Sequence, residues 1–223
     1  AECNALTAEI VGQFKNIIGE QYVLVDEDTR KNYGHDETEN LLFLPDVVVK
    51  PRTANEISNL FNLCNKHIIP VTPRGAGTGL SGGALPQFGG VLVLLERMNS
   101  IINIDERNLQ VTVEPGVITE TLQNAVKEKG LFYPPDPTEW SCYLGGTVAT
   151  NASGARTFKY GTTRDNVLGL VVADGAPLID TAPTIYGQPD GLSLFSGTTA
   201  TFEVQAVGAA PLRYQWLHES TNV

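Results

Sequence analysis

The residues best suited to bind a ligand form a glycine-rich loop at residues 73–83, with the sequence PRGAGTGLSGG. Five glycines in eleven residues free the backbone for positive φ angles and let a ligand approach the main chain closely. Successive N–H groups in such a loop can point inward and bind an anion. The alternative is a flexible surface turn. Two predicted buried strands flank the loop, and Thr78 and Ser81 add hydroxyl donors, so we favour phosphate binding.

Within this loop, Gly77, Gly79 and Gly82 match the GxGxxG spacing of the dinucleotide-binding fingerprint. That fingerprint needs its last glycine in a helix that leads to the next strand. Only residues 83–90 separate the loop from the next predicted strand, and Pro86 and the glycine pair at 89–90 prevent a helix of useful length. No Gly-Lys-Ser/Thr follows either, which excludes a P-loop.

A second segment, residues 134–154, combines prolines with a run of small residues. Its small residues leave one face almost free of side-chain bulk, so a flat ligand could lie there: Gly145, Gly146, Ala149, Ala152 and Gly154. Polar residues of the same segment would then hydrogen-bond to heteroatoms on the ligand rim: Thr138, Ser141, Asn151 and Ser153. The alternative is tight packing of these small residues against a neighbouring strand.

Regular elements must position both segments. A helix is predicted from Thr7 to Gly19, and a strand at residues 46–49 is followed by a helix whose capping box spans residues 53–56. A second buried strand at residues 68–72 leads into the glycine loop. After the loop we expect strands at 91–95, 101–104 and 111–114, a helix at 119–129 ended by Gly130, and a last buried strand at 167–173. The predicted fold class is α+β.

Composition excludes several classes of function. The net charge of -10 provides no basic stripe for nucleic acid, so a bound phosphate would be held largely by backbone N–H groups. No stretch is long enough to span a membrane, and residues 1–14 lack the basic segment and apolar run of a signal peptide, so we expect none. Three distant cysteines without CxxC argue against disulfides and zinc, and the three histidines are too scattered for a metal site. We therefore expect a reduced, cytoplasmic chain without a metal, while the tail described next leaves an extracellular origin open.

Near Gly175 the composition changes. Residues 176–223 contain one Arg and no Lys, and residues 199–206 and 212–217 alternate in the manner of half-buried strands. This tail is predicted to be all-β, and it resembles the opening strands of a bacterial immunoglobulin-like domain that ends near its third strand.

Five ordered segments resemble the FAD-binding domain of the vanillyl-alcohol oxidase and p-cresol methylhydroxylase (PCMH) superfamily. They are residues 44–52, the glycine loop, residues 113–116, residues 134–154 and residues 160–167. The resemblance covers roughly residues 40–175 and is strongest to the branch that holds the glycolate oxidase FAD subunit and D-lactate dehydrogenases. Together with the resemblance of the tail, it implies a fold in three parts: a helical lead-in at 1–40, an incomplete FAD-binding domain at 41–175, and the partial immunoglobulin-like segment at 176–223.

The resemblance also implies the cofactor-binding residues. The loop would wrap the FAD diphosphate, and residues 135–141 and 145–154, with Tyr160 and Gly161 in the same wall, would line the flavin and its ribityl chain. The implied set is Arg74, Gly75, Ala76, Gly77, Thr78, Gly79, Leu80, Ser81, Gly82, Gly83, Pro135, Asp136, Pro137, Thr138, Ser141, Gly145, Gly146, Ala149, Asn151, Ser153, Gly154, Tyr160 and Gly161. A histidine can stand near the position of Thr78 in covalent relatives, so the FAD here is expected to be noncovalent.

The implied activity is hydride transfer from a 2-hydroxy acid, such as glycolate or D-lactate, to the flavin. The family's substrate domain would follow Gly175, so we expect little turnover from this chain alone and assign no catalytic residue. Glu139 beside Trp140 resembles a base, but a structural role is at least as plausible. Two alternatives stay open at this point: a non-enzymatic surface or interaction protein with an immunoglobulin-like module, and a fused or truncated gene product.

Overall fold

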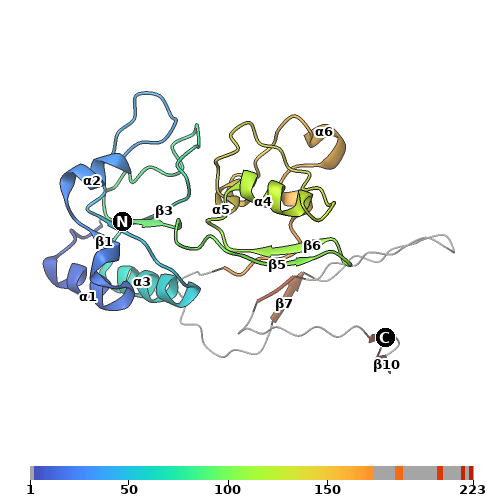
Figure 1. The fold of residues 1–223 in the computed structure, drawn as a ribbon. Coiled ribbons are helices and arrows are strands. Elements are labelled where there is room, and N and C mark those ends of the chain that lie inside the picture. The colour runs from blue at the N-terminus through green and yellow to red at the C-terminus, as the bar shows by residue number, and fades with distance from the viewer. Residues whose placement is uncertain (1–2, 173–183, 188–204, 208–216, 219–220, 223) are drawn as a thin grey trace.

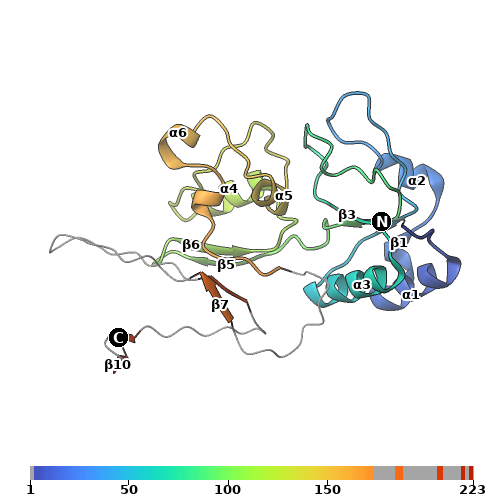
Figure 2. The same cartoon turned by 180° about the vertical axis from the view of Figure 1, so that it is seen from behind.

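The computed structural model describes residues 3–172 and the backbone of four short strands at 184–187, 205–207, 217–218 and 221–222. Figures 1 and 2 show two lobes side by side within residues 3–172. The first lobe, residues 3–98, contains α1 to α3 and β1 to β4; the second lobe, residues 99–172, contains β5, β6 and α4 to α6. The chain passes between the lobes just before β5.

The first lobe is built on a mixed four-stranded sheet in the order β1-β2-β4-β3. Strands β2 (Val47–Val49) and β3 (Val71–Arg74) run parallel to β4 (Val91–Leu94), while β1 (Val23–Leu24) is antiparallel to β2. Every side chain of β2 and β4 is buried. Such continuous apolar runs are typical of parallel strands that are covered on both faces.

Helices α1 (Ala8–Ile18) and α3 (Ala54–His67) cover one face of this sheet, where Phe14 and Leu60 are almost fully buried beside Val47 and Val49. The N-terminal helix therefore shares the core of the sheet. On the other face, Val48 packs with Leu92, Leu94 and partly buried residues that include Tyr33, which follows α2 (Glu27–Asn32). The turn η1 (Glu20–Tyr22) joins α1 to β1.

The start of both helices agrees with the sequence patterns. Thr7 and Thr53 accept hydrogen bonds from the backbone of Ile10 and Glu56. Only half of the expected capping box forms, however, because the Glu56 carboxylate accepts from the backbone N–H of Arg52, at 2.6 Å, and not from that of Thr53.

The predicted strand at residues 68–72 is wrong at its beginning. Ile68 ends α3 in the left-handed conformation, with φ +54° and its N–H directed back to Asn65, and its side chain is exposed. Strand β3 starts only at Val71. Helical hydrogen bonding thus extends through His67, and the chain needs Ile68 and the next two residues to turn toward the sheet.

The second lobe consists of a β-ribbon covered by short helices. Strands β5 (Ile101–Asp105) and β6 (Gln110–Val113) pair antiparallel, and α4 (Thr119–Lys127) buries Leu122 and Val126 against them together with Val117 and Leu144. Gly130, with φ +72°, follows this helix as predicted. The lobe is completed by α5 (Leu144–Ala149), α6 (Thr157–Tyr160) and η2 (Arg164–Asn166).

The predicted buried strand at 167–173 does not form over its described part. Residues 167–172 are not a strand, and Leu168, Leu170 and Val172 are well exposed. A strand needs a partner that accepts its backbone hydrogen bonds, and no described strand pairs with this segment.

Beyond this segment, β7 (Thr184–Gly187) pairs antiparallel with β8 (Gln205–Val207), and β9 (Leu217–His218) with β10 (Thr221–Asn222). The remainder of the predicted immunoglobulin-like segment lies outside the described residues. No helix in the described part of the chain is long and apolar enough to cross a membrane.

Candidate functional site

The glycine loop leaves the sheet at the edge where the carboxyl ends of its parallel strands meet. Arg74 is the last residue of β3, Lys50 follows β2, and Leu95 and Glu96 follow β4. In open sheets with parallel strands, ligands bind in the crevice outside this edge. Residues 75–90 contain no helix, as predicted for a loop that is not the dinucleotide fingerprint.

The backbone of the loop offers a row of unused donors. Within the part of the chain that the structure describes, the N–H groups of residues 76–81 donate to no protein acceptor. Gly77 and Gly82 adopt positive φ angles of 79° and 71°, which turn the chain as a side-chain-bearing residue rarely does. Leu80 is 76% exposed, so the tip of the loop faces outward. Unpaired N–H groups in a glycine-rich bend are available to bind an anion.

Arg74 lies beneath this loop with its guanidinium buried. The residue is 7% exposed, and its Nη1 has no hydrogen-bond partner among the described residues. A Cβ on Gly77 would come within 2.0 Å of Arg74 Nη2, so the absence of a side chain at Gly77 makes room for the guanidinium. Burial lowers the pKa of Arg74, and the negative charge of Asp36 opposes this shift. The group nevertheless stays protonated, because arginine is effectively always charged in proteins.

The small-residue segment meets the glycine loop through Tyr143, the N-cap of α5. A Cβ placed on Gly75 would lie 3.4 Å from Tyr143 Cβ. Gly75 of the loop and Tyr143 of the 134–154 segment therefore lie next to each other. The 460 Å³ groove between α1 and α3, lined by Gln13, Asn59 and Lys66 among others, contains none of the predicted cofactor residues.

The two interpretations of the small residues, tight packing and an open surface for a flat ligand, apply to different positions. At Gly145 a Cβ would come 2.7 Å from Pro115 Cβ, and at Gly154 it would come 1.6 Å from the carbonyl oxygen of Asp136, so these glycines permit tight packing. At Gly146, by contrast, nothing lies within 4 Å. Residues 144–149 also form helix α5, which sequence reasoning missed because glycine has low helix propensity.

The polar residues of this segment are partly committed to the protein. Asn151, with φ +50°, accepts a hydrogen bond from Arg164 N on its Oδ1. The backbone N–H of Ser141 donates to Glu139, and this bond lowers the pKa of the Glu139 carboxyl. Glu139 therefore acts as a local cap of this turn, and a carboxyl with a lowered pKa is a weaker base. Thr138 and Ser153 are exposed, and Ala149 is exposed at the end of α5.

Tyr160 and Gly161 lie at the end of the second lobe that is remote from the glycine loop. Helix α6, which ends at Tyr160, is far from β3 in Figures 1 and 2. The Tyr160 ring meets Phe132 edge-on at 5.4 Å. Beside it, Arg156 pairs with Asp136 at 3.3 Å. Pro137 forms a β-bridge with Gly154, and the Pro135 carbonyl accepts from Gln123, so the proline segment is attached to the rest of the lobe.

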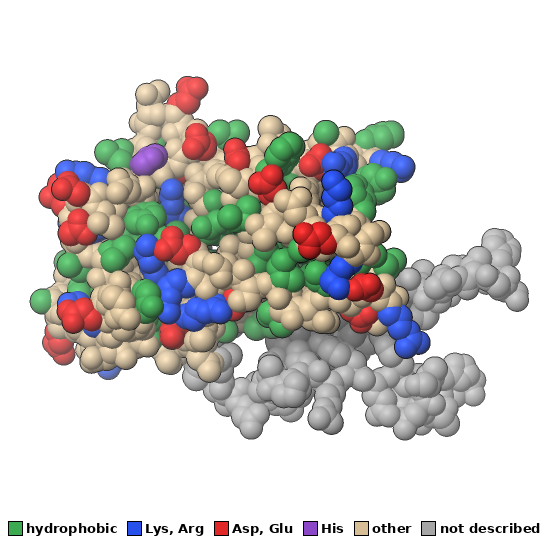
Figure 3. All heavy atoms as spheres, viewed as in Figure 1, with side chains coloured by type: hydrophobic (Ala, Val, Ile, Leu, Met, Phe, Trp, Pro, Cys, Tyr) green, Lys and Arg blue, Asp and Glu red, His purple; other side chains and the backbone are tan. Residues whose placement is uncertain are grey.

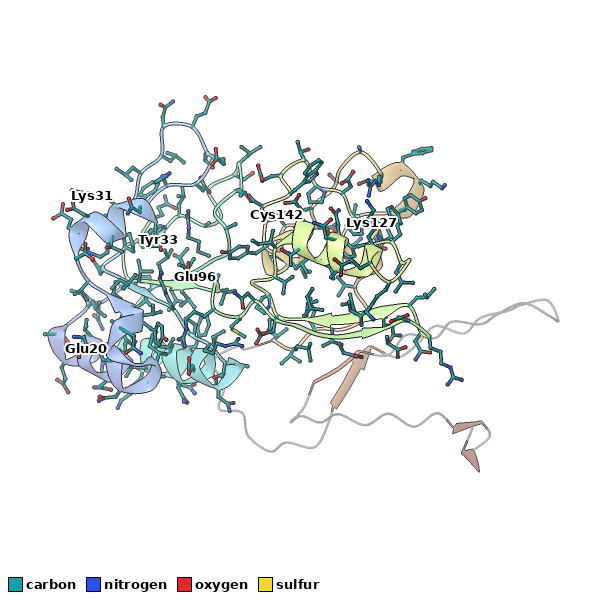
Figure 4. All side chains as sticks on the ribbon, in the orientation of Figure 1. Glu20, Lys31, Tyr33, Glu96, Lys127 and Cys142 are labelled. Atoms are coloured by element: carbon teal, nitrogen blue, oxygen red, sulfur yellow. The ribbon has the colours of Figure 1, made fainter. Side chains whose placement is uncertain are left out.

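Sequence reasoning missed a polar cluster at the strand ends. Lys50 Nζ lies 2.6 Å from Glu96 Oε1 and donates to the Tyr33 hydroxyl at 3.1 Å. Burial would lower the pKa of Lys50, but the hydrogen bonds to Glu96 and Tyr33 outweigh it and raise that pKa. Figure 4 labels Tyr33 and Glu96 in the first lobe and Cys142 in the second. Tyr33 and Glu96 lie on the side of the first lobe that faces the second. The sequence did offer one signal for this cluster: Lys50 follows a buried strand directly, and ligands bind at the carboxyl ends of such strands.

Charges on the visible face alternate in sign, since Lys and Arg side chains lie among Asp and Glu side chains in Figure 3. No group of three or more His, Cys, Asp or Glu side chains within the described residues is arranged to hold a metal ion. Cys3, Cys64 and Cys142 are free thiols.

The residues present fit FAD. Its diphosphate needs donors that approach closely, and the loop supplies free N–H groups above the unpartnered Nη1 of Arg74. Its flat ring system needs an uncovered surface, and Gly146 faces open space next to Tyr143.

Comparisons with known proteins support FAD as the cofactor. The glycolate oxidase subunit GlcD of Bacillus subtilis is 42% identical over 173 residues, which are 76% of this chain and 37% of that protein. D-lactate dehydrogenase of Anaerostipes hadrus is 38% identical over 195 residues, 86% of this chain and 41% of that protein. The chain thus spans about two fifths of the length of these relatives.

Among solved structures, alkyldihydroxyacetonephosphate synthase superposes with a TM-score of 0.66 at 22% identity, over 74% of this chain and 32% of that chain, which establishes the fold alone. Residues 45–177 match the family described as FAD binding domain. The chain therefore belongs to the FAD binding domain family, within the lineage of FAD-linked oxidoreductases.

Proposed function

We propose that this chain is the FAD-holding part of an enzyme that oxidises a 2-hydroxy acid such as glycolate or D-lactate. One observation carries the cofactor assignment: free backbone N–H groups of residues 76–81 lie above a buried arginine whose Nη1 has no partner among the described residues. The names of the relatives, glycolate oxidase subunit and D-lactate dehydrogenase, support the substrate class.

Each part of the chain has a distinct task in this proposal. The loop residues from Arg74 to Gly83 bind the diphosphate through their main chain, and the open surface at Gly146 receives the flavin side of the cofactor. The remaining wall residues predicted from the sequence line the flavin and its ribityl chain, with Tyr160 and Gly161 at the end of this wall that is remote from the glycine loop. Bound flavin accepts the hydride of the substrate, while the protein supplies orientation and electrostatics.

FAD is proposed to bind without a covalent link at the glycine loop, because Thr78 cannot form the bond that a histidine makes near this position. We also propose three parts of the chain, residues 1–40, 41–175 and 176–223, with the last of these immunoglobulin-like. The match of residues 45–177 to the FAD binding domain family supports the second boundary. The antiparallel pairs β7–β8 and β9–β10 support a β-rich last part.

Ligand titration tests the cofactor proposal. FAD, FMN and riboflavin are titrated into the flavin-free chain while flavin fluorescence is followed, and ADP is added as a competitor. Because the diphosphate supplies the principal contact, FAD is expected to bind at least about tenfold more tightly than riboflavin. ADP is expected to displace it. Equal affinity for FAD and riboflavin, or no binding of FAD, would contradict the proposal.

A second measurement concerns the substrate. Glycolate and D-lactate are each offered to the FAD-loaded chain with an artificial electron acceptor. Substrate positioning supplies several kcal/mol of catalysis, and in the proposed enzyme it comes from residues outside this chain, so turnover is expected to be slight. Bleaching of the flavin absorbance by either acid, but not by acetate, would support the substrate class. Steady turnover would overturn the assignment of substrate positioning to another part of the enzyme.

A further inference from the structure

The segment from Gly34 to Phe43, which links α2 to β2, has no role in the proposal above. We call it the 34–43 segment. The Phe43 N–H donates to the Gly34 carbonyl at 2.8 Å, so its two ends are tied together. A Cβ on Gly34 would come within 2.8 Å of the Phe43 carbonyl oxygen, and only glycine permits this closure. Figure 1 shows the segment (blue) rising beside the glycine loop (green).

Two hydrogen bonds connect this segment to the glycine loop. Gly82 N–H donates to Thr38 Oγ1 at 2.8 Å, and Glu37 N–H donates to the Gly79 carbonyl at 3.1 Å. Among the described residues, these are the only hydrogen bonds that join residues 75–83 to any residue beyond the loop and its continuation to Gly90. The shape of the loop therefore depends on the 34–43 segment.

Asp36 holds Thr38 in place. The carboxylate Oδ1 of Asp36 accepts a hydrogen bond from Thr38 N at 2.9 Å, which is the pattern of an Asx turn. Asp36 is 7% exposed, and its Oδ2 is one of two buried side-chain polar atoms without a partner among the described residues. The other is Nη1 of Arg74, beneath the same loop. A buried anion and a buried cation thus both lie next to the loop, each with one atom still unpaired.

We propose that Asp36 and Thr38 are positioning residues for the diphosphate of FAD: Thr38 holds the glycine loop in the shape that presents its free N–H groups, and Asp36 fixes Thr38 and balances the charge of Arg74. This inference rests on the proposed function. A loop with five glycines has many accessible backbone conformations and loses this freedom when it becomes ordered. Contacts that order the loop before the ligand arrives therefore increase affinity.

The test uses three variants of the full 223-residue chain. Thr38→Val removes the acceptor with little change of shape, and Thr38→Ser restores a hydroxyl. Thr53→Val is the matched control, because Thr53 makes the same kind of bond, to Glu56 N at 3.2 Å, away from the loop. For each variant we measure the dissociation constants of FAD, ADP and riboflavin and the urea midpoint of the flavin-free chain.

Thr38→Val is expected to raise the dissociation constants of FAD and ADP by about tenfold. The loss of one hydrogen bond to an otherwise flexible loop is a change of that order. Riboflavin binding is expected to stay the same, and Thr38→Ser to bind FAD nearly as the wild type does. Thr53→Val is expected to lower the urea midpoint without changing any dissociation constant. Amide hydrogen exchange at Gly82 is expected to accelerate in Thr38→Val, which reports the lost bond even if that variant is less stable.

The outcomes separate the inference from the function on which it rests. A wild-type chain that fails to bind FAD would overturn the proposed function. A wild-type chain that binds FAD, with Thr38→Val binding FAD and ADP equally well, would overturn the positioning role alone. If Thr38→Val and Thr53→Val weakened FAD binding equally, the positioning role would also be overturned, because a general loss of stability would then explain the weaker binding.

Discussion

Arg52 and Glu114 form an ion pair that joins the two lobes: Arg52 Nη1 donates to both carboxylate oxygens of Glu114, at 2.9 and 2.8 Å. Ser100 takes part, since its N–H donates to Glu114 and its hydroxyl accepts from Arg52 Nη2. Arg52 lies just after β2 and Glu114 just after β6, so the pair helps to set the distance between the glycine loop and the small-residue segment.

Stability is expected to depend on pH through this pair. Burial disfavours the ionised Glu114, but hydrogen bonds from Arg52 and Ser100 outweigh it and lower the pKa of its carboxyl. A carboxyl with a lowered pKa in the folded chain stabilises the fold above its unfolded pKa of about 4.3 and loses this contribution as the pH falls through the folded value. Glu114→Gln should cost about 1 kcal/mol near neutral pH, a modest amount because Arg52 is partly exposed.

Urea unfolding of the wild type and Glu114→Gln at a series of pH values checks this prediction. The two free energies of unfolding should converge as the pH falls below about 4. Glu20→Gln is a suitable control, because that carboxylate pairs with Lys15 on the surface and should contribute little. A difference between wild type and Glu114→Gln that persists unchanged in acid would contradict the role of the ionised pair.

Replacement of Gly77 should weaken FAD binding. Gly77→Val places a Cβ where Arg74 Nη2 now lies and forces a branched residue into a positive φ of 79°. We expect at least about a tenfold rise in the dissociation constant of FAD, since backbone strain of this kind costs about 1 kcal/mol or more and is expected to distort the loop. Ala76→Gly, in the same loop, should have a smaller effect. Equal flavin content in the two purified variants would count against the loop as the diphosphate site.

Neighbouring glycines of α5 should respond in opposite ways. Gly146→Leu faces open space and replaces a poor helix former, so the flavin-free chain should be at least as stable as the wild type while FAD binds more weakly. Gly145→Leu should instead destabilise the chain, because its side chain would collide with Pro115. Thermal unfolding and FAD titration distinguish the two. Unchanged FAD affinity in Gly146→Leu would remove this surface from the cofactor site.

The charge of Arg74 should contribute more to the affinity for FAD than to the free energy of unfolding. In Arg74→Met combined with Asp36→Asn, both buried charges next to the loop are removed, so neither is left without its counter-charge. Replacing buried charges with neutral groups is often neutral or stabilising, and we expect no loss in the free energy of unfolding. FAD affinity should fall by about tenfold and depend less on salt concentration. An unchanged affinity would show that backbone donors alone hold the diphosphate.

The reactivity of the thiols tests whether Cys64 and Cys142 are buried. Burial raises the pKa of Cys64 to about 12 and also raises the pKa of Cys142, whereas Cys3 is exposed. Because the thiolate is the reactive form, one thiol should react rapidly with a disulfide reagent in the folded chain and all 3 after denaturation. Cys3→Ser should abolish the rapid reaction. Rapid labelling of two thiols in the native chain would contradict the packing around Cys64 or Cys142.

Much of this architecture is local in origin, which is why sequence patterns predicted it. Thr7 and Thr53 begin helices where their side chains cap the first turn, the runs at β2 and β4 are fully buried, and Gly130 follows α4. The glycine loop and the absence of a helix after it were also predictable, since glycine and proline act on the backbone of their own segment.

Features that depend on contacts between distant parts of the chain were not predictable in this way. Gly145 and Gly146 are identical in sequence, yet one packs against Pro115 and the other faces open space. Thr38 carries no motif, and only folding brings it within 2.8 Å of Gly82. Residues 167–172 have the composition of a buried strand, but no described strand pairs with them. Local periodicity specifies which way a segment can fold, whereas its neighbours in space decide which atoms remain free to bind a ligand.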